Sequence, residues 1–252
     1  MKKIALLLSV MSFITACSEN VRPLVIGHRG ARGHIAENTL PSIQKAIDLG
    51  VDGIEIDIFR CASGELVVFH DMTLEKLTNA EGYIEQISLD SIRKIAVLND
   101  YAIPTLAEAL ELIDGQVLLN IELKGANTAV LTHELLQPYL AQEQWGPEHF
   151  IISSFNWKEL QDFAAINTQI PIAVLTEDDP LDALPIAQQL NAVAINPNYQ
   201  MLTPEIVQKI KKKGLKIYPW TINQPEDIKK AIDLAVDGII TDFPERVHDQ
   251  LN

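Results

Sequence analysis

Two acidic side chains and a histidine are predicted to meet near the beginning of the chain. Glu55 and Asp57 alternate with isoleucines over residues 53–58, so a strand here would place both carboxylates on one face. The following turn is centred on Ser-Gly and leads into a second β-rich run at 66–71. If the two runs form a hairpin, Asp57 lies nearly opposite His70. Because like charges buried side by side are costly unless a cation joins them, this stretch predicts a divalent metal site.

Strand-like apolar runs alternate with helix-like segments along the rest of the chain. Candidate strands lie at 24–28, 53–58, 117–123, 150–154, 172–175, 192–196, 217–221 and 238–241. Candidate helices lie at 39–49 (with Thr39 as N-cap), 105–113, 128–139, 158–165, 204–213 and 225–234. Eight strands with intervening helices in 252 residues predict an α/β fold, a parallel (β/α)8 TIM barrel. A doubly wound open sheet is the alternative, but no glycine-rich dinucleotide turn follows the first strand.

An internal repeat supports the barrel. Residues 45–57 recur almost unchanged as 230–242, so we expect the same helix-to-strand unit to build the second and eighth strands. Glu55 of the first copy is matched by Ile240 of the second. The fold therefore tolerates an apolar residue at this place, and the carboxylate of Glu55 needs a reason beyond packing.

Residues 72–104 interrupt the alternation. They contain a short helix-like piece at 89–95 but no complete strand–helix unit. We interpret them as an insertion after the second-strand hairpin, above the barrel mouth, where they shape the substrate pocket. Residues 24–252, with this insertion included, are expected to form one catalytic domain.

The amino-terminal residues have the pattern of an export signal. Lys2 and Lys3 precede an apolar run at 4–14 that is too short for a spanning helix. The sequence from 14 to Cys17 resembles the lipobox of bacterial lipoproteins. It implies a signal peptide at 1–16, an acylated Cys17 and a tether at 17–23. Ser18 resembles the residue that sorts such proteins to the outer membrane, in the cell envelope and facing the periplasm. An ordinary signal peptide with an incidental Cys17 is the alternative.

The charge of the chain excludes some partners. A formal net charge of −14 is unsuited to nucleic acid or to anionic membrane surfaces, so we expect membrane contact only through the lipid anchor. The basic run at 209–213 precedes Gly214 and is typical of a helix C-terminus. With Cys17 acylated, Cys61 is the one remaining thiol and no intramolecular disulfide is expected. The sequence does not indicate an oligomeric state.

Polar residues at the expected carboxyl ends of the strands form a recognisable set, because the site of such a barrel lies at those ends. The set consists of His28-Arg29-Gly30, Glu37-Asn38-Thr39, Glu55-x-Asp57, His70-Asp71, Glu122-x-Lys124, Ser153-Ser154-Phe155, Trp220-Thr221-x-Asn223 and Thr241-Asp242-Phe243-Pro244. In these motifs the chain resembles the glycerophosphodiester phosphodiesterases, a family of metal-dependent barrel enzymes. The resemblance covers essentially the whole mature chain.

The resemblance implies that Glu55, Asp57 and Glu122 hold one divalent ion, and that Arg29 and Lys124 contact the phosphate. Three carboxylates facing a phosphodiester would repel it. A hard cation such as Mg²⁺ or Ca²⁺, which prefers oxygen ligands, removes this conflict. The two basic side chains can then balance charge that develops on the phosphoryl oxygens.

The resemblance also implies that His28 and His70 act as the acid–base pair. Histidine suits this task because its unperturbed pKa lies near neutrality. The implied reaction converts a glycerophosphodiester, a small-molecule substrate, to glycerol 3-phosphate and an alcohol. The glycerol 2-hydroxyl would attack first and give a cyclic phosphate, which water then opens. The sequence does not decide which histidine is the base.

Three of the remaining motif positions, Glu37, Asn38 and Trp220, allow either a functional or a purely structural interpretation. Glu37 and Asn38 either support the site from behind or only turn the chain and cap the next helix. Trp220 either lines the substrate pocket or packs in the core. We interpret Asp71 and Asp242 as loop anchors. The histidines that match no motif position are interpreted as surface or structural residues; these are His34, His133, His149 and His248.

Three competing functions are left open. A lysophospholipase D-like enzyme would use the same chemistry on a substrate with an acyl chain. A non-catalytic binding lipoprotein would be expected to lack a metal ligand or a histidine, and none is missing here. A barrel lyase or aldolase would use Lys124 to form a Schiff base.

Overall fold

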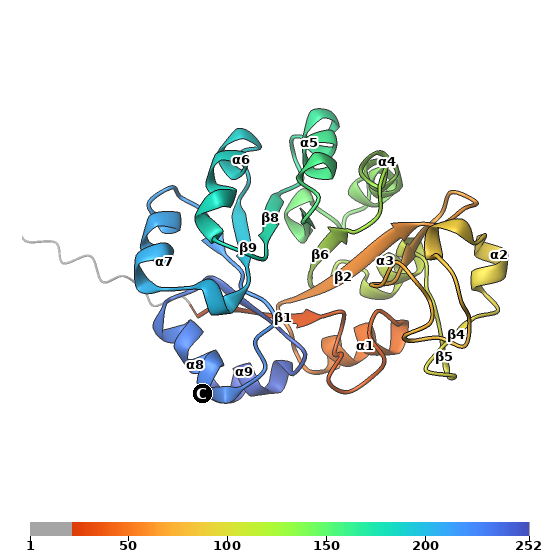
Figure 1. Cartoon of the computed structure of the whole chain (residues 1–252), viewed down its shortest axis with the longest axis horizontal. Helices are drawn as coiled ribbons and strands as arrows, with labels where there is room; N and C mark the ends of the chain where they lie inside the picture. The colour runs from red at the N-terminus through yellow and green to blue at the C-terminus, as the bar shows by residue number, and fades with distance from the viewer. Residues whose placement is uncertain (1–21, 252) are drawn as a thin grey trace, which may run out of the picture.

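The computed structural model describes residues 22–251, and the protein is a nearly closed parallel barrel (Figure 1). Its eight strands lie in the order β10-β9-β8-β7-β6-β2-β1-β11. Between β10 and β11 the barrel is joined by hydrogen bonds from Ile240 N to Pro219 O and from Ile222 N to Ile240 O, both 3.0 Å long. The predicted (β/α)8 fold is confirmed. The strands are β1 Leu24–His28, β2 Gly53–Arg60, β6 Leu118–Leu123, β7 Phe150–Ser154, β8 Ile172–Thr176, β9 Ala194–Pro197, β10 Lys216–Ile217 and β11 Gly238–Thr241.

Helices cover the outside of the strands. They are α1 Leu40–Asp48, α3 Leu106–Ile113, α4 Ala129–Leu140, α5 Trp157–Ile166, α6 Leu184–Gln189, α7 Pro204–Lys211, α8 Pro225–Asp233 and α9 Pro244–Leu251. Thr39 caps α1 as predicted, accepting a hydrogen bond from Ser42 N. Two of these helices, α6 and α9, were not predicted. Both have a proline in the first turn, where its missing N–H costs nothing, and α6 is short enough to be mistaken for a loop.

The barrel interior has two levels. Near the amino ends of the strands an apolar plug fills the barrel, formed by Ile26, Ile151, Ala173, Ala194, Tyr218 and Ile240. The next inward-facing residues along the strands are polar, such as His28 after Ile26. Side chains packed between the sheet and the helices form a larger, separate core. The plug therefore supports a polar cavity at the carboxyl ends of the strands.

The insertion forms a small unit of its own beside the barrel. After the hairpin strand β3 (Leu66–Val68), which pairs antiparallel with β2, it contains η1 Ile84–Gln86, α2 Leu89–Ile92 and the two-stranded β4 Ala96–Val97 and β5 Tyr101–Ala102. Figure 1 shows α2, β4 and β5 to one side, beyond the carboxyl end of β2. This unit packs on a second apolar cluster that includes Phe59 and Phe69 from the hairpin.

The chain is fixed where it enters the barrel. Arg22 donates two hydrogen bonds of 2.7 Å to the carboxylate of Asp52, which also accepts one from Val25 N at 2.8 Å. Asp52 immediately precedes β2, so this contact lies at the amino ends of the strands, opposite the polar cavity. Nothing in residues 22–251 forms a helix long and apolar enough to cross a membrane. The predicted signal peptide at 1–16 and the predicted lipidation site Cys17 lie outside the described residues.

Candidate metal and phosphate site

Three carboxylates meet on two neighbouring strands. β2 and β6 are parallel, with Glu55 beside Asn120 and Asp57 beside Glu122. One oxygen from each of Glu55, Asp57 and Glu122 lies within 4.8 Å of the others, and all three side chains are buried. Glu55 and Asp57 share a face of β2 because they are two residues apart in the strand. The parallel register places Glu122 of β6 beside Asp57. This geometry can hold a metal ion.

The three acids are electrostatically unequal. Burial, with the charges of Asp57 and Glu122, raises the pKa of Glu55 well above its usual value. Burial and the charge of Asp57 raise the pKa of Glu122 to about 7. Burial alone would raise the pKa of Asp57 too, but nearby positive groups, chiefly Arg29, lower it overall. The cluster thus holds more negative charge than its surroundings neutralise.

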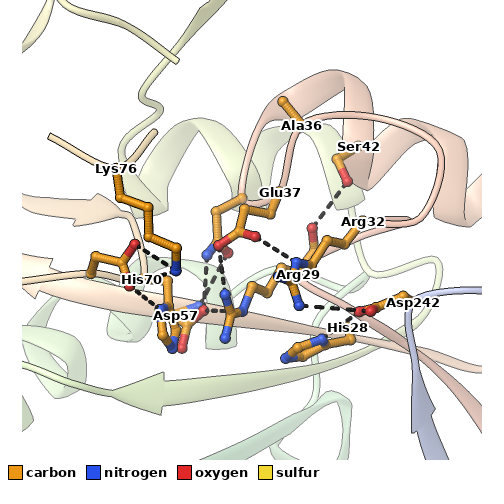
Figure 2. A network of polar contacts seen from close by, with 12 residues as sticks. His28, Arg29, Arg32, Ala36, Glu37, Ser42, Asp57, His70, Lys76 and Asp242 are labelled. Carbon is orange, nitrogen blue, oxygen red and sulfur yellow. Dashed lines mark hydrogen bonds and ion pairs between the residues drawn. The ribbon is translucent and has the colours of Figure 1, made fainter. Parts of the chain in front are cut away.

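Arg29 links the loop after β1 to this cluster (Figure 2). Its guanidinium donates to Glu37 Oε1 at 2.5 Å, and its Nε lies 3.2 Å from Asp57 Oδ2. Its backbone N–H donates to Glu55 Oε2 at 3.0 Å. Asn38 completes the support by donating from Nδ2 to Asp57 Oδ2 at 2.8 Å. Glu37 and Asn38 therefore stand directly behind the acids and their arginine.

Lys124 follows β6 and lies beside the same acids. Its Nζ is 3.1 Å from Glu122 Oε1 and 3.9 Å from Asp57 Oδ1. Burial would lower the pKa of Lys124, but the charges of Glu122 and Asp57 raise it overall. The lysine therefore remains an ammonium group at neutral pH.

His28 is held between carboxylates at the end of β1. Its Nδ1 lies 2.6 Å from Asp242 Oδ1, and its Nε2 lies 4.0 Å from Glu55 Oε2. Asp242 is itself oriented by Asn223, which donates to Asp242 Oδ2 at 2.8 Å. Burial lowers the pKa of His28, although the hydrogen bond to Asp242 opposes this. The imidazole is therefore fixed through Nδ1 and directs Nε2 toward the acids.

His70 is held in a similar way from the hairpin. Its Nδ1 lies 2.8 Å from Asp71 Oδ1, and its Nε2 lies 3.1 Å from Lys124 Nζ. Lys76 of the insertion pairs with the other oxygen of Asp71 at 3.2 Å (Figure 2). Burial lowers the pKa of His70, with the charge of Asp57 opposing. The hairpin brings Phe69 N within 3.0 Å of Asp57 O, so His70 lies next to the acids, as expected for the predicted hairpin.

These residues surround one cavity of about 300 Å³. Its lining includes both histidines, Arg29, Lys124 and two of the acids, together with the apolar side chains of Phe155, Leu175 and Trp220. Lys124 Nζ lies 6.0 Å from the centroid of the Phe155 ring. A larger surface hollow of about 700 Å³ beside α7 and α8 contains none of the predicted site residues. The structure thus brings Trp220 into the same cavity as the acids and histidines.

Two interpretations from the sequence need correction. Asp71 and Asp242 are more than loop anchors, because each contacts the imidazole of a site histidine. The insertion does not shape the cavity directly: among the described residues, none from 72–104 belongs to its lining. Its nearest influence is the ion pair between Lys76 and Asp71. The insertion packs sideways because Phe59 and Phe69 offer it an apolar surface there.

Sequence reasoning also missed residues that the structure places at the site. Arg32 pairs with Glu37 Oε2 at 2.5 Å and lies 3.6 Å from Asp242 Oδ2. Glu177, after β8, lines the cavity. The repeat contained a usable signal for Asp242. It aligns this residue with Asp57, and in a closed barrel the last strand neighbours the first, which carries His28.

Known proteins resemble this chain over most of its length. The model of the glycerophosphoryl diester phosphodiesterase family matches residues 28–246. A glycerophosphodiester phosphodiesterase of Caldanaerobacter subterraneus subsp. tengcongensis is 36% identical over 89% of this chain and 96% of its own length. A solved phosphodiesterase of Oleispira antarctica, in complex with the product sn-glycerol-3-phosphate, has a TM-score of 0.84 and 27% identity, covering 91% of this chain and 97% of its own. Human lysophospholipase D GDPD1 is 24% identical over 90% of this chain and 85% of its own length.

Proposed function

We propose that this chain, which belongs to the glycerophosphoryl diester phosphodiesterase family and is an enzyme of that class, uses one divalent cation to hydrolyse glycerophosphodiesters to glycerol 3-phosphate and an alcohol. The observation that carries this proposal is the cluster of Glu55, Asp57 and Glu122, of which Glu55 and Glu122 line one cavity with His28 and His70. The product named for the Oleispira antarctica enzyme supports the same substrate class.

The carboxylates fit a hard divalent cation such as Mg²⁺ or Ca²⁺. Asp57 Oδ1 is buried without a hydrogen-bond partner, and a buried carboxylate oxygen in that state is costly unless a ligand meets it. The pKa values of Glu55 and Glu122 are raised first by burial and then by the neighbouring negative charges. A bound cation would relieve this repulsion as well. When bound, the ion would neutralise the acids and polarise a phosphoryl oxygen.

Arg29 and Lys124 are proposed to bind the phosphate. Arg29 is locked by Glu37 and Asp57, so its position is set before substrate arrives. Lys124 has a compact ammonium group beside Glu122. Prepositioned positive groups stabilise charge that grows on phosphoryl oxygens without reorganising during the reaction. Glu37 and Asn38 are proposed to support the site by fixing Arg29 and Asp57.

His28 and His70 are proposed to move the protons. Each is fixed through Nδ1 by an aspartate, so Nε2 is the atom proposed to exchange a proton with substrate. In His70 this atom contacts the Lys124 ammonium, so substrate would take the place of that contact. One takes a proton from the attacking hydroxyl or water, and the other gives one to the leaving alcohol. They must therefore work in opposite protonation states, and a bell-shaped pH profile is expected. The same profile in His28→Ala or His70→Ala would contradict the pair.

The site residues support the three competing functions to different degrees. A Schiff-base lyase requires a lysine that loses its proton easily, whereas the neighbouring acids raise the pKa of Lys124 above the value that burial alone would give. A binding lipoprotein has no use for two histidines each oriented by an aspartate. A lysophospholipase D-like activity keeps every residue in its role, and the likeness to GDPD1 favours it as the second candidate.

The location of the enzyme is proposed from the sequence. Cleavage after Ala16 and acylation of Cys17 would anchor it in the cell envelope, in the outer membrane facing the periplasm. Mass spectrometry of the membrane-extracted protein should find a lipid-modified Cys17 as its first residue. Cys17→Ala should release it from the membrane, and an unmodified amino terminus in the wild type would contradict the anchor.

The proposed reaction is tested by release of glycerol 3-phosphate from glycerophosphocholine, using protein that lacks residues 1–17. Assays with Mg²⁺, with Ca²⁺ and with EDTA would be compared for the wild type and for Glu55→Ala. Glu143→Ala is the matched control, because Glu143 is an exposed glutamate away from the cavity. We expect metal-dependent release in the wild type and the control, and its loss in Glu55→Ala. No release with any metal would contradict the proposed substrate.

A further inference from the structure

Arg32 lines the cavity but is not one of the groups proposed to bind the metal, to bind phosphate or to move protons. It lies in the loop after β1, and backbone contacts set the place of this loop. Gly33 N donates to Asp242 O at 3.0 Å, and a Cβ at Gly33 would lie only 2.3 Å from the ring of Phe243. The loop is therefore pressed against the segment that follows β11, and Arg32 lies at this contact.

The two carboxylates beside Arg32 each hold another residue of the site. Arg32 Nε lies 2.5 Å from Glu37 Oε2, and the other oxygen of Glu37 accepts a hydrogen bond of 2.5 Å from Arg29. Arg32 Nη1 lies 3.6 Å from Asp242 Oδ2, and the other oxygen of Asp242 lies 2.6 Å from His28 Nδ1. Arg32 thus lies between the carboxylate that holds the proposed phosphate-binding arginine and the carboxylate that orients a proposed acid–base histidine (Figure 2).

These contacts differ from an ordinary surface ion pair, which contributes little because solvent screens it. The side chains of Glu37 and Asp242 are only 7% and 13% exposed, against 37% for Arg32. A guanidinium is planar and presents its donors in a fixed fork, so one arginine can hold two carboxylates in a defined relative position. A buried carboxylate that loses its cation is costly. Without Arg32, both carboxylates would therefore shift toward other partners and carry their own residues with them.

We infer that Arg32 is a positioning residue, which keeps the phosphate-binding group and the proton-transferring group of the site in fixed places relative to each other. It acts on Arg29 through Glu37, and it acts on His28 through Asp242. The inference rests on the proposed function and adds a residue to it. In this role Arg32 makes no contact with substrate, so its effect on the reaction depends on the two carboxylates.

The inference is tested by combining Arg32→Met with a substitution of each carboxylate. Methionine removes the charge and keeps much of the side-chain length. In hydrolysis of glycerophosphocholine with metal, we expect Arg32→Met to lower kcat about tenfold and to raise KM about threefold, as for other residues that orient the groups of a site. Added to Asp242→Asn, it should lower kcat by less than about twofold further. Added to Glu37→Gln, it should raise KM by less than about twofold further, because contacts that share a partner are not additive.

Two further variants separate positioning from charge and stability. Arg93→Met removes an arginine whose side chain is 38% exposed and pairs with Glu108 at 2.8 Å outside the cavity, so both constants should be unchanged. Arg32→Lys keeps the charge but replaces the planar fork by one compact group, so kcat should stay at least about threefold below the wild type. This conservative variant also tests the inference if Arg32→Met does not fold. Thermal denaturation shows that each variant is folded in the assay.

The outcomes separate this inference from the proposed function. An undiminished effect of Arg32→Met in either double variant would show that Arg32 acts independently of that carboxylate, and would overturn the inference. Unchanged constants in Arg32→Met, wild-type constants in Arg32→Lys or an equal loss in Arg93→Met would also overturn it, and each would leave the phosphodiesterase intact. Failure of the wild type itself to hydrolyse the diester would contradict the proposed function, and the inference with it.

Discussion

The two copies of the repeat lie on either side of β1 and contribute different groups to one histidine. In the first copy α1 leads into β2, and in the second α8 leads into β11; both strands pair with β1 in parallel. Glu55 of the first copy lies 4.0 Å from His28 Nε2. The corresponding Ile240 of the second belongs to the apolar plug. The next polar residue of the second copy, Asp242, binds His28 Nδ1.

This difference separates what the fold requires from what the chemistry requires. The same backbone unit accepts a carboxylate or an isoleucine at the position of Glu55, so the acid there serves the proposed ion. An aspartate ends both copies, yet Asp57 joins the acid cluster whereas Asp242 orients an imidazole. The residues on the neighbouring strand, and not the local sequence, decide which task each aspartate has.

The substitution Glu55→Ile removes this difference between the copies, because it places in the first copy the isoleucine that the second copy has at position 240. We expect it to have the largest effect. Activity should fall on the order of 10³-fold, because a metal site that has lost a ligand no longer stabilises the transition state. The metal-free variant should remain folded and melt no lower than the wild type, since a costly buried carboxylate is gone. Glycerol 3-phosphate release and thermal denaturation measure the two effects. Activity within tenfold of the wild type would contradict the role of Glu55.

The second copy is tested by Asp242→Asn. We expect kcat to fall roughly 100-fold, because an amide cannot hold the His28 imidazole as a carboxylate does. The hydrogen bond to Asp242 opposes the lowering of the His28 pKa by burial, so the limb of the pH–rate profile that belongs to His28 should move to lower pH. Asp249→Asn, on the exposed side of α9, serves as control. A loss of activity with an unmoved profile would point to a structural role for Asp242 instead.

The acid cluster of the first copy should make metal-free stability depend on pH in an unusual direction. Burial raises the pKa of Glu122 to about 7 in the folded state, so folded protein binds more protons than unfolded protein below that pH. Stability is therefore gained as pH falls through 7 and lost as pH rises through 7. Between pH 8 and pH 6 the free energy of unfolding should rise by about 1 kcal/mol from Glu122 alone.

Denaturant titrations in EDTA at both pH values measure this effect. Saturating metal should abolish or reverse it, since the ion binds the deprotonated acids. Glu122→Gln should abolish the contribution of Glu122 without metal. Burial lowers the pKa values of His28 and His70, so these groups act in the opposite direction in both proteins. A metal-free wild type that gains no stability relative to Glu122→Gln on acidification would contradict the assignment.

The smallest expected effect is on the stability of the two corresponding turns between helix and strand. Gly50 of the first copy has φ 74°, and its counterpart Ala235 has φ 54°, a left-handed conformation that strains any residue with a Cβ. Ala235→Gly should stabilise the protein by about 0.5–1 kcal/mol and Gly50→Ala should destabilise it by about 1 kcal/mol. A Cβ at Gly50 would meet no atom within 4 Å, so conformation alone is tested. Chemical denaturation measures both, and shifts of the same sign would contradict the comparison.

The placement of most site residues could be predicted because strand geometry determines it. Alternation in β2 fixed the face of Glu55 and Asp57, and the hairpin placed His70 beside them. The contacts of His28 with Asp242 and of His70 with Lys124 could not be predicted in the same way, because they join residues 214 and 54 positions apart. They depend on closure of the barrel and on side-chain conformation. The sideways packing of the insertion depended likewise on an apolar surface that exists only once the hairpin has formed.

The ion pair between Arg22 and Asp52 has a consequence for how the enzyme would stand in the envelope. It fixes the entering chain at the end of the barrel opposite the cavity. If Cys17 is acylated as proposed, five residue steps separate it from Arg22, and a chain of that length spans at most about 18 Å. The amino ends of the barrel strands would then face the membrane, and the cavity at their carboxyl ends would open toward the aqueous space. Such an enzyme would collect dissolved diesters that diffuse past it, and lipids of its own membrane would lie beneath it and out of reach.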